Sequence, residues 1–564
     1  MRTPAVLVSI LLLVSCLLVS CGESERGGEQ PGTTTEGGRV NSIGVVLPDD
    51  AVDASRQMLR SMSPEPKSLD PSIEPYDTEQ TILPFEALLF KDEHWNPIPG
   101  AAHSWGSDDG IVWTFNLRSG MRWSDGSPLT AHDFVYSYRR MLDPESTNIY
   151  AFFYYDIKNA EAIVKGENKD LESLGIRAVD DTTLVIETEK RAPYLPHIVS
   201  FGDAMPVPKR LVDKYGRKWT EPQNIITNSG FMVTEWVNGS HMTLVPNPYY
   251  NGPHKPFLEK VIHPFRNAAA ATILPYESDE VDMENVDVND LERIERDPEL
   301  KNDLVRFHGL NTWYLFFRTQ LPPFNDIRVR EAFTRVMDRD NICNIILRGG
   351  AVPAYSMIPP GFREFEGDTH AAVQGFDPER ARQLMREAGY PGGQGFPRQE
   401  LWLRAPTPSD RLIGVAIQSM LKEHLGVDVD IRTADLHTYM DHLYEWNMNL
   451  GLIAFGADFL DPRNILDMIW HSQPRGHGRQ DWHNPTFDRL VDAAAAELNP
   501  EIRESLYREA SAVHVADYPG AFLYHKMGLQ LRKPWLKGYA VNDDGTVGSF
   551  RWHKLYIAEV DDGE

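Results

Sequence analysis

Histidine is the first residue type in this sequence whose spacing could support chemistry. His471, His477 and His483 are evenly spaced in HSQPRGHGRQDWHN, and a Gly- and Pro-containing loop of this kind could hold a metal ion. His437 and His442 are five residues apart, which places them off a common helical face. We interpret the three loop histidines as surface residues and predict no metal site.

Carboxylates crowd the segment ESDEVDMENVDVND at residues 277–290, and oxygen ligands of this type suit Ca²⁺. The segment lacks the ligand spacing and the central glycine of an EF-hand loop. A simpler interpretation is that a strand ends there. Acidic residues would then precede a helix near Asn289, where the helix dipole favours negative charge.

Common catalytic signatures are missing from the sequence. It contains no GxSxG, HExxH, GxxxxGKS/T or CxxC motif. The glycines of YPGGQGFP follow a predicted helix and do not open one, so they indicate a turn. We therefore predict no enzymatic activity, no catalytic residues and no cofactor.

The tetrad LVSC occurs twice near the N-terminus and ends at Cys16 and at Cys21. An apolar run from Ala5 to Ser20 follows Arg2, and it is shorter than the roughly 18 residues of a spanning helix. A small residue before a cysteine resembles the lipobox of bacterial lipoproteins. Because polar residues follow Cys21 and apolar ones follow Cys16, we predict a signal peptide at residues 1–21 and lipid on Cys21. The alternative is an ordinary secretory signal in which both cysteines are incidental.

Chain length and net charge limit the number of lobes and the kinds of binding partner that are expected. The chain has 564 residues, more than one core usually supports, so two or three lobes are expected. Its formal charge of −26 argues against binding nucleic acid or anionic lipid by charge. After cleavage only Cys343 would accompany Cys21, so no internal disulfide is expected in an exported protein. Residues 22–54 are predicted to form a flexible tether.

Local patterns predict a mixed α/β fold. VWTFNL and MRW alternate like paired strands, and Thr130 with Asp133 resembles a capping box that opens a helix through Met141. Asp377 and Pro378 predict a second helix start. Further helices and strands are indicated in the segments DDTTLVIETEK, HMTLVPNP, LIGVAIQSMLKEHLGVDVDI, NPTFDRLVDAAAAEL and PEIRESLYREASAVHVAD.

Six segments, in order, resemble the extracellular solute-binding proteins of family 5, the oligopeptide- and dipeptide-binding receptors of ABC importers. They are SLDP…FEALL, WTFNLRSGMRWSDGSPLTAHDFVYSYRRMLDP, NIITNSGFMVTEW, PPFNDIRVREAF…DRDNI, GADFLDP and KPWLKGY. The resemblance runs from about residue 57 to the C-terminus.

The resemblance implies an α/β, periplasmic-binding-protein-like (class II) fold with three lobes and a ligand cleft between two α/β lobes. Lobe I would comprise residues 55–86, 208–309 and 534–564, lobe II residues 87–207, and lobe III residues 310–533. Ligand in the cleft would favour closure. The implied partners are a peptide and the permease subunits of an ABC transporter, and the protein would be a lipid-anchored monomer in the periplasm or on the outer face of the cell membrane.

In such receptors an aspartate after alanine pairs with the α-ammonium of the peptide. The matching block here is Ala457-Asp458-Phe459, which makes Asp458 the main candidate. A buried ammonium requires a carboxylate partner, and charge-assisted hydrogen bonds provide one. The alternative is that Asp458 caps the next turn, a role that Asp461 before Pro462 could already fill.

The family also binds the peptide backbone as an added strand. The positions that match its other contacts are Glu74, Tyr150, Asn285, Phe455, Gly456, Ala457 and Tyr524. Each of these could equally be an ordinary core or surface residue.

Some positions depart from the family's pattern. Asn311 and Gly456 stand where such receptors can carry a disulfide, and Leu443 and Leu452 stand where basic residues bind a short peptide's carboxylate. Leu436 replaces a tryptophan, and Arg411 could substitute for the missing basic groups. Ligand length therefore stays open, with longer, amidated or cell-wall-derived peptides among the choices.

Three other functions remain as alternatives. The same fold could bind a metal chelate, a sugar or an opine, although Asp458 favours an amine. A surface hydrolase would need a nucleophile–base pair or a metal cluster, and the sequence offers neither. A sensor or chaperone that feeds no transporter is also compatible with the sequence.

Overall fold

The computed structural model describes residues 39–73, 84–202, 205–266, 272–404, 407–473, 479–547 and 552–560. The predicted signal peptide with Cys21 and most of the predicted tether lie outside these residues, as do Glu74 and His477. Cys343 is buried and unpaired. Within the described ranges, no helix combines the length and the apolar character that crossing a bilayer requires.

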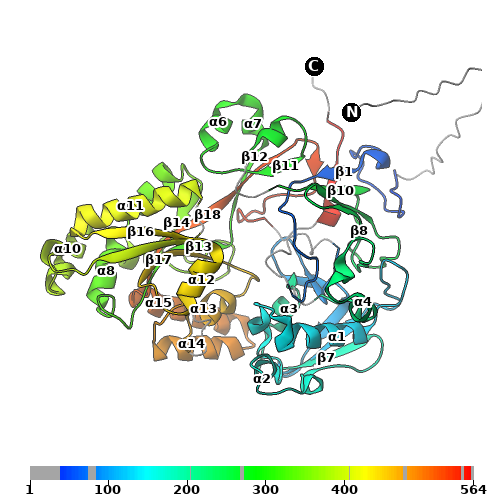
Figure 1. The fold of residues 1–564 in the computed structure, drawn as a ribbon, viewed down its shortest axis with the longest axis horizontal. Coiled ribbons are helices and arrows are strands. Elements are labelled where there is room, and N and C mark those ends of the chain that lie inside the picture. The colour runs from blue at the N-terminus through cyan, green and yellow to red at the C-terminus, as the bar shows by residue number, and fades with distance from the viewer. Residues whose placement is uncertain are drawn as a thin grey trace, which may run out of the picture. The chain divides into compact units, whose positions relative to one another are not determined.

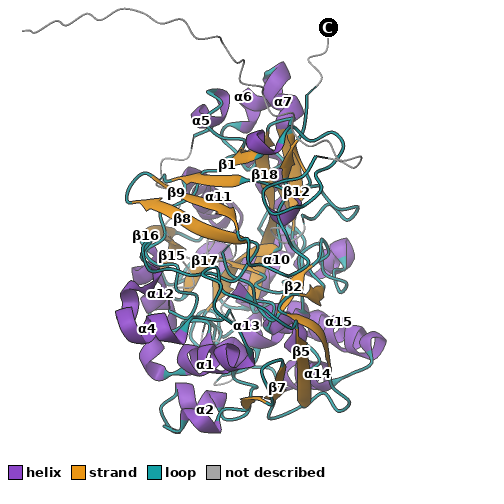
Figure 2. Ribbon diagram, turned by 90° about the vertical axis from the view of Figure 1, so that its right-hand side faces the viewer, coloured by secondary structure: helices purple, strands orange, loops and turns teal. Residues whose placement is uncertain are grey.

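Two four-stranded sheets come from the first half of the chain. Strands β1, β8, β9 and β10 form one of them, and β1, β9 and β8 are labelled in Figure 2. In sheet order they are β1 (Met58–Arg60), β10 (Lys260–Pro264), β9 (His241–Pro246) and β8 (Phe231–Val237). The second sheet is antiparallel, in the order β4 (Ala102–Gly106), β5 (Val112–Leu117), β7 (Thr183–Glu187) and β6 (Ile176–Ala178).

The largest sheet comes mainly from the second half of the chain. Its order is β11 (Met283–Asn285), β18 (Gly520–Arg532), β13 (Asn311–Phe317), β17 (Leu450–Gly456), β15 (Gln399–Arg404) and β16 (Val429–Ala434), with β12 (Leu304–His308) and β14 (Ala351–Pro353) also paired to β18. Two strand pairs stand apart, β2 (Leu89–Lys91) with β3 (Pro97–Pro99) and β19 (Leu536–Lys537) with β20 (Tyr556–Ile557).

Within the largest sheet, β15 runs parallel to both β16 and β17. Parallel neighbours need crossover connections, and helices α11 (Pro408–Leu425) and α12 (Leu436–Tyr444) supply them (Figure 1). The carboxyl ends of the three strands therefore lie at one edge of the sheet. Ligands of α/β sheets commonly bind at such an edge.

The remaining helices cover the sheets and connect them. They are α1 (Ala131–Leu142), α2 (Ala160–Val164), α3 (Leu195–Ile198), α4 (Lys209–Tyr215), α5 (Leu274–Glu277), α6 (Leu291–Arg296), α7 (Pro298–Asp303), α8 (Ile327–Arg335), α9 (Ala371–Gln374), α10 (Pro378–Glu387), α13 (Met468–Trp470), α14 (Pro485–Ala496) and α15 (Pro500–Ala516).

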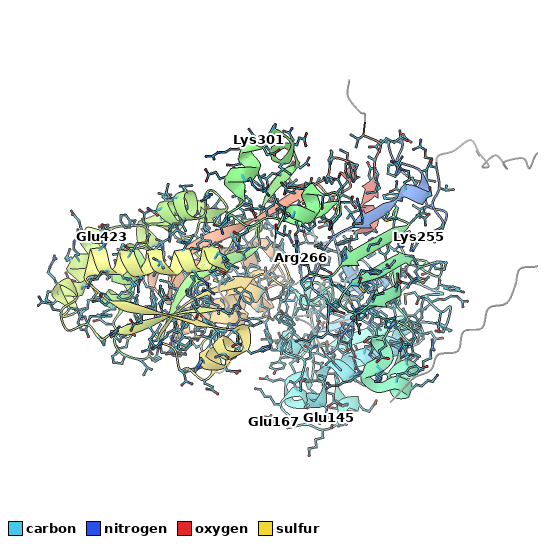
Figure 3. The ribbon with its side chains drawn as sticks, turned by 45° about the horizontal axis from the view of Figure 1, so that its top comes forward. Glu145, Glu167, Lys255, Arg266, Lys301 and Glu423 are labelled. Atoms are coloured by element: carbon cyan, nitrogen blue, oxygen red, sulfur yellow. The ribbon has the colours of Figure 1, made fainter. Side chains whose placement is uncertain are left out.

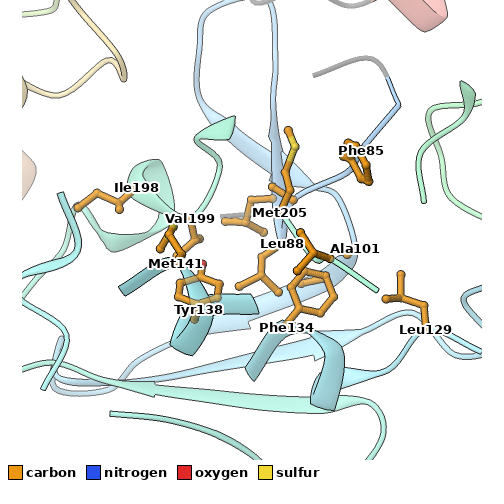
Figure 4. Close-up of a cluster of buried hydrophobic side chains, with 14 of the residues drawn as sticks. Phe85, Leu88, Ala101, Leu129, Phe134, Tyr138, Met141, Ile198, Val199 and Met205 are labelled. Carbon is orange, nitrogen blue, oxygen red and sulfur yellow. The ribbon is translucent and has the colours of Figure 1, made fainter. Parts of the chain in front are cut away.

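Helix α1 begins at a capping box and buries one apolar face. The Thr130 backbone N–H donates to the Asp133 carboxylate at 2.8 Å, which confirms the predicted start. Phe134, Tyr138 and Met141 then recur at helical spacing and pack into one apolar cluster (Figure 4). Burying aromatic side chains of this size contributes roughly 1.5–3 kcal/mol each.

Helix α10 also begins as predicted. The Asp377 carboxylate accepts from the Arg380 N–H at 2.9 Å, and Pro378 occupies the first turn. Gly389 follows the helix with φ of 94°, a conformation that glycine adopts without strain.

The segment 39–54, assigned above to the tether, belongs to the fold. Leu47 and Ala51 are buried, and Ala51 pairs with Ala558 near the other end of the chain. The Asn41 side chain donates to the Pro256 carbonyl at 2.8 Å. The prediction of a flexible tether is therefore wrong for these residues. The segment lacks a periodic pattern, but contacts with residues far away in the sequence hold it in place.

Each four-stranded sheet falls within one predicted lobe, and most of the largest sheet falls within residues 310–533. Strands β11 and β12 precede that range but pair with β18. The long β18 therefore continues from one predicted lobe toward the other. Charged side chains lie mainly on the outside, as Figure 3 shows for Glu145, Glu167, Lys255, Lys301 and Glu423.

Candidate functional site

A cavity of about 570 Å³ lies at the carboxyl ends of the three parallel strands. Arg404 is the last residue of β15, Leu436 and His437 follow β16 by way of α12, and Gly456 ends β17. The remaining described lining residues are Ile73, Thr147, Ile149, Tyr150, Phe152, Met440, Tyr444, Ala454, Phe455, Asp458 and Arg479. A cavity of this size suits a small organic ligand.

The structure brings several of the sequence-predicted site residues together. Asp458, Tyr150, Phe455 and Gly456 all line this cavity. Ala457 joins them along the chain, and its N–H donates to the Leu310 carbonyl at 2.7 Å. The strand end is therefore fixed by main-chain bonds on one side and borders the cavity on the other.

Asn464 positions the Asp458 side chain. Its side-chain carbonyl accepts from the Asp458 N–H at 2.9 Å, and its amide donates to the Asp458 carboxylate at 3.3 Å. Asn464 is fully buried in a π-helical turn, Arg463–Asp467, so its amide is held in place. Sequence reasoning missed Asn464, because its position in the sequence does not indicate that its side chain binds Asp458, six residues earlier.

The surroundings of the Asp458 carboxylate compensate its charge only in part. Burial raises its pKa to about 6, and the Asn464 hydrogen bond and the charges of Arg479 and Lys91 oppose that rise only in part. Among the described residues, no cationic group forms a salt bridge with this carboxylate. The Lys91 ammonium donates to the Asp458 backbone carbonyl at 3.0 Å. An ionised Asp458 would therefore be stabilised by a cation entering the cavity.

Aromatic rings pack around the segment that carries Asp458. Phe459 is fully buried, and its ring contacts Phe153 edge-on at 5.6 Å. Phe153 in turn stacks on Tyr150 at 5.2 Å, and Phe201 meets Tyr150 edge-on at 5.3 Å. These rings come from the range predicted as lobe II, so the segment that carries Asp458 is anchored to that range.

The carboxylates just beyond Asp458 are paired. Asp461 accepts from the Arg503 guanidinium at 2.8 Å and from the Arg463 N–H at 3.0 Å. Arg463 pairs with both Asp156 and Asp467. These ion pairs hold the chain that follows the cavity and connect it to the range predicted as lobe II.

A larger cavity of about 860 Å³ borders Leu460, Asp461 and Pro462. Its lining includes the Asp461–Arg503 pair and Glu364, whose pKa burial raises to about 7. The smaller cavity is the better candidate, because it lies at the sheet edge and its carboxylate forms no salt bridge with any described residue. Within the described ranges, no group of three or more His, Cys, Asp or Glu side chains could hold a metal ion.

Comparison with known proteins places the chain in a family. Residues 96–477 match the family described as "Bacterial extracellular solute-binding proteins, family 5 Middle". The chain belongs to this family.

Individual members resemble the chain over most of its length. The periplasmic oligopeptide-binding protein OppA of Salmonella typhimurium is 31% identical over 498 residues, which cover 86% of this chain and 90% of OppA. The probable deoxycholate-binding periplasmic protein YgiS of Escherichia coli is 30% identical over 487 residues, which cover 85% of this chain and 90% of YgiS. The solved structure of the Escherichia coli murein tripeptide binding protein MppA superimposes with a TM-score of 0.77 at 30% identity and covers 90% of this chain and 99% of MppA.

Three residues that the family resemblance suggested do not line the smaller cavity. Tyr524 is buried and stacks on Trp313 at 5.7 Å, and Asn285 accepts from Gln530 at 3.2 Å on β11. Arg411 is exposed on α11. Glu74 lies outside the described residues, although the preceding Ile73 reaches the cavity.

The structure shows where the residues that depart from the family's pattern lie. Asn311 and Gly456 are direct cross-strand partners, as expected for positions where relatives can carry a disulfide. Leu443 and Leu452 are buried, whereas Leu436 lines the cavity.

Sequence reasoning missed two arginines at the cavity, Arg404 and Arg479. Arg404 ends the alternating segment QELWLR, and an arginine at the end of a strand was the signal available. Arg479 follows the histidine-containing segment and offered no comparable pattern.

Proposed function

We propose that this protein is the substrate-binding receptor of an ABC importer and that it captures extended peptides by their free N-terminus. The observation that carries the proposal is the Asp458 carboxylate, which faces the cavity without a salt bridge among the described residues. An α-ammonium would supply the missing charge. Charge-assisted hydrogen bonds of this kind are about twice as strong as neutral ones.

The end of β17 supports recognition of a peptide backbone. The pairing of β15 with β17 ends at Leu403 and Leu452. Ala454, Phe455 and Gly456 continue past that point and line the cavity. A peptide could add to this strand edge, so that main-chain bonds provide affinity with little demand on sequence.

Asp458→Asn tests the role of the charge. The variant should weaken binding of a free-amine tetrapeptide by roughly 3–5 kcal/mol, because the ligand's ammonium would be buried without a counter-charge. Binding of the N-acetylated tetrapeptide should change little. Isothermal titration calorimetry at pH 7.5 would measure both.

Asp441→Asn provides the matched control, since Asp441 is exposed on α12 and is not among the cavity's lining residues. It should leave both affinities unchanged. Equal losses for the free and acetylated peptides in Asp458→Asn would contradict the proposed role.

A non-peptide solute is the second candidate. The relative YgiS is named as a probable deoxycholate-binding protein, so a relative of similar identity carries a different ligand assignment. Native mass spectrometry of protein purified without denaturation separates the two candidates. A series of peptide masses supports the first, and a single non-peptide adduct supports the second.

We also propose that the protein is exported and lipid-anchored through Cys21, because the sequence around it resembles a lipobox. Several acyl chains on one cysteine would hold it firmly at a membrane surface. Cys21→Ser should move the protein from the membrane fraction to the soluble fraction, whereas Cys16→Ser should not. The reverse pattern would assign the lipid to Cys16.

A further inference from the structure

The larger cavity has no part in the proposed capture of peptides. Its volume of about 860 Å³ lies within the range of small-molecule sites. Segments 360–365 and 460–462 line it, and His94 and His197 reach it from the range predicted as lobe II. No described residue lines both this cavity and the smaller one, so a ligand here would have a site of its own.

Glu364 is a buried carboxylate at this cavity. The residue is 7% exposed and belongs to the cavity lining. No other residue that the structure describes donates a hydrogen bond to its carboxylate or forms a salt bridge with it. Burial and, to a smaller extent, the nearby Asp461 carboxylate raise its pKa to about 7 against the opposing charge of Arg503. A buried carboxylate without a partner is stabilised by a cation that enters the cavity.

The backbone around Glu364 is held in place by the fold. The Phe365 N–H donates to the Phe362 carbonyl at 3.1 Å and closes a turn whose two central residues are Arg363 and Glu364. Phe362 is buried, and the Arg508 guanidinium donates to the Arg363 carbonyl at 2.7 Å. The Glu364 side chain is therefore presented to the cavity from a fixed backbone.

Both arginines that line this cavity are already paired. The Arg503 guanidinium donates to the Asp461 carboxylate at 2.8 Å. The Arg363 guanidinium lies 2.7 Å from the Glu504 carboxylate. Neither guanidinium pairs with Glu364, so the positive charges at the cavity are directed at other carboxylates.

The other ionisable groups at this cavity leave it negative. Asp368 and Asp544 line it and are exposed, and within the described ranges neither forms an ion pair. Burial lowers the pKa of His308 and lowers that of His197 to about 4, so both lining imidazoles are neutral at pH 8. A cation that enters the cavity therefore meets carboxylates without a competing arginine or lysine among the described lining residues.

The cavity's lining also indicates what kind of cation fits. Among the residues that the structure describes, no group of three or more His, Cys, Asp or Glu side chains could hold a metal ion, so the matching cation is organic. Phe362 and Leu460 add apolar surface that suits methylene groups.

We propose that the larger cavity binds an organic polycation, with one ammonium group on the Glu364 carboxylate and the others attracted by Asp368 and Asp544. Charge-assisted hydrogen bonds to the buried carboxylate supply the strongest contact, and the two exposed carboxylates add weaker attraction. This site is separate from peptide capture, so its failure would leave the proposed function intact.

Spermidine, a linear polyamine, is the probe, and triethylene glycol is an uncharged chain of similar length. Isothermal titration calorimetry at pH 8 keeps Glu364 mostly ionised. Salt at about 150 mM weakens binding to exposed carboxylates elsewhere on the surface. The wild-type protein should bind spermidine and should show no measurable binding of the glycol.

Glu364→Gln removes the charge and keeps the shape of the side chain. It should weaken spermidine binding about tenfold or more, because an ammonium loses its charged partner. Asp368→Asn alters an exposed residue and should weaken binding by about twofold to fivefold. Glu379→Gln is the matched control, since Glu379 is exposed on α10 and lines neither cavity, and it should bind spermidine like the wild type. Urea denaturation should show that none of the three variants lowers the free energy of unfolding.

Asp458→Asn separates the two cavities, because spermidine could also place an ammonium on Asp458. This variant should bind spermidine within about threefold of the wild type. The proposal is overturned if the wild type binds spermidine no better than the glycol, or if Glu364→Gln or Asp368→Asn binds it as tightly as the wild type. A loss in Asp458→Asn as large as that in Glu364→Gln would also overturn it.

Discussion

Asp458 and Asp461 are three residues apart in one segment, yet their carboxylates have opposite electrostatic surroundings. Burial raises the pKa of Asp458 to about 6. For Asp461 the effect of burial is exceeded by the Arg503 charge and its hydrogen bond, so the pKa is lowered. One carboxylate is thus paired with a cation, whereas the other forms no salt bridge among the residues that the structure describes.

The difference separates a structural pair from a binding group. Arg503 and Asp461 form a buried pair in which each satisfies the charge of the other, so removing one partner would leave the other buried without compensation. Asp458 is held by Asn464 without being neutralised. A group that is oriented but not compensated is suited to a ligand that carries the opposite charge, and perturbed carboxylates of this type gather at functional sites.

The largest expected effect is on stability. Asp461→Asn should lower the free energy of unfolding by roughly 3–5 kcal/mol, because it leaves the Arg503 guanidinium buried without its carboxylate. Asp458→Asn at pH 8 should leave the free energy of unfolding unchanged or raise it, because an uncompensated charge is removed. Urea denaturation followed by tryptophan fluorescence would measure both.

The comparison fails if the two variants behave alike. A loss in Asp458→Asn as large as that in Asp461→Asn would mean that Asp458 is compensated inside the folded chain. It would then have no need of a ligand's charge.

Local signals made part of the fold predictable. The Asp377–Pro378 start, the Thr130 capping box and the helix that runs into β16 depend on residues a few positions apart, and all three are confirmed. The docking of residues 39–54 was missed, because it depends on Asn41 and Ala51 meeting residues more than 200 positions away.

The candidate site was predictable only through resemblance. The Ala457-Asp458-Phe459 block pointed to Asp458, but nothing in its spacing showed that Asn464 would orient it. Arg411 was the expected basic group, whereas Arg404 and Arg479 are the arginines that line the cavity. The position of Arg404 depends on strand order, since β15 lies next to β17 and places its last residue at the shared edge.

A smaller effect concerns the pH dependence of ligand affinity. The ligand's ammonium pairs with the ionised form of Asp458, whose pKa burial raises to about 6. Below that pH the Asp458 carboxyl is mostly protonated, so it must release its proton when the peptide binds. Affinity for a free-amine peptide should therefore be constant near pH 7 and fall below pH 6, by at most about tenfold per pH unit. Calorimetric titrations between pH 5 and 7 avoid the range in which Lys91, with a pKa lowered by burial to about 8, changes charge. The N-acetylated peptide and Asp458→Asn should both show a flat profile over this range. A fall of the same size in Asp458→Asn would assign the proton to another group, such as Glu364 with its pKa of about 7, and would remove the contrast between the two aspartates.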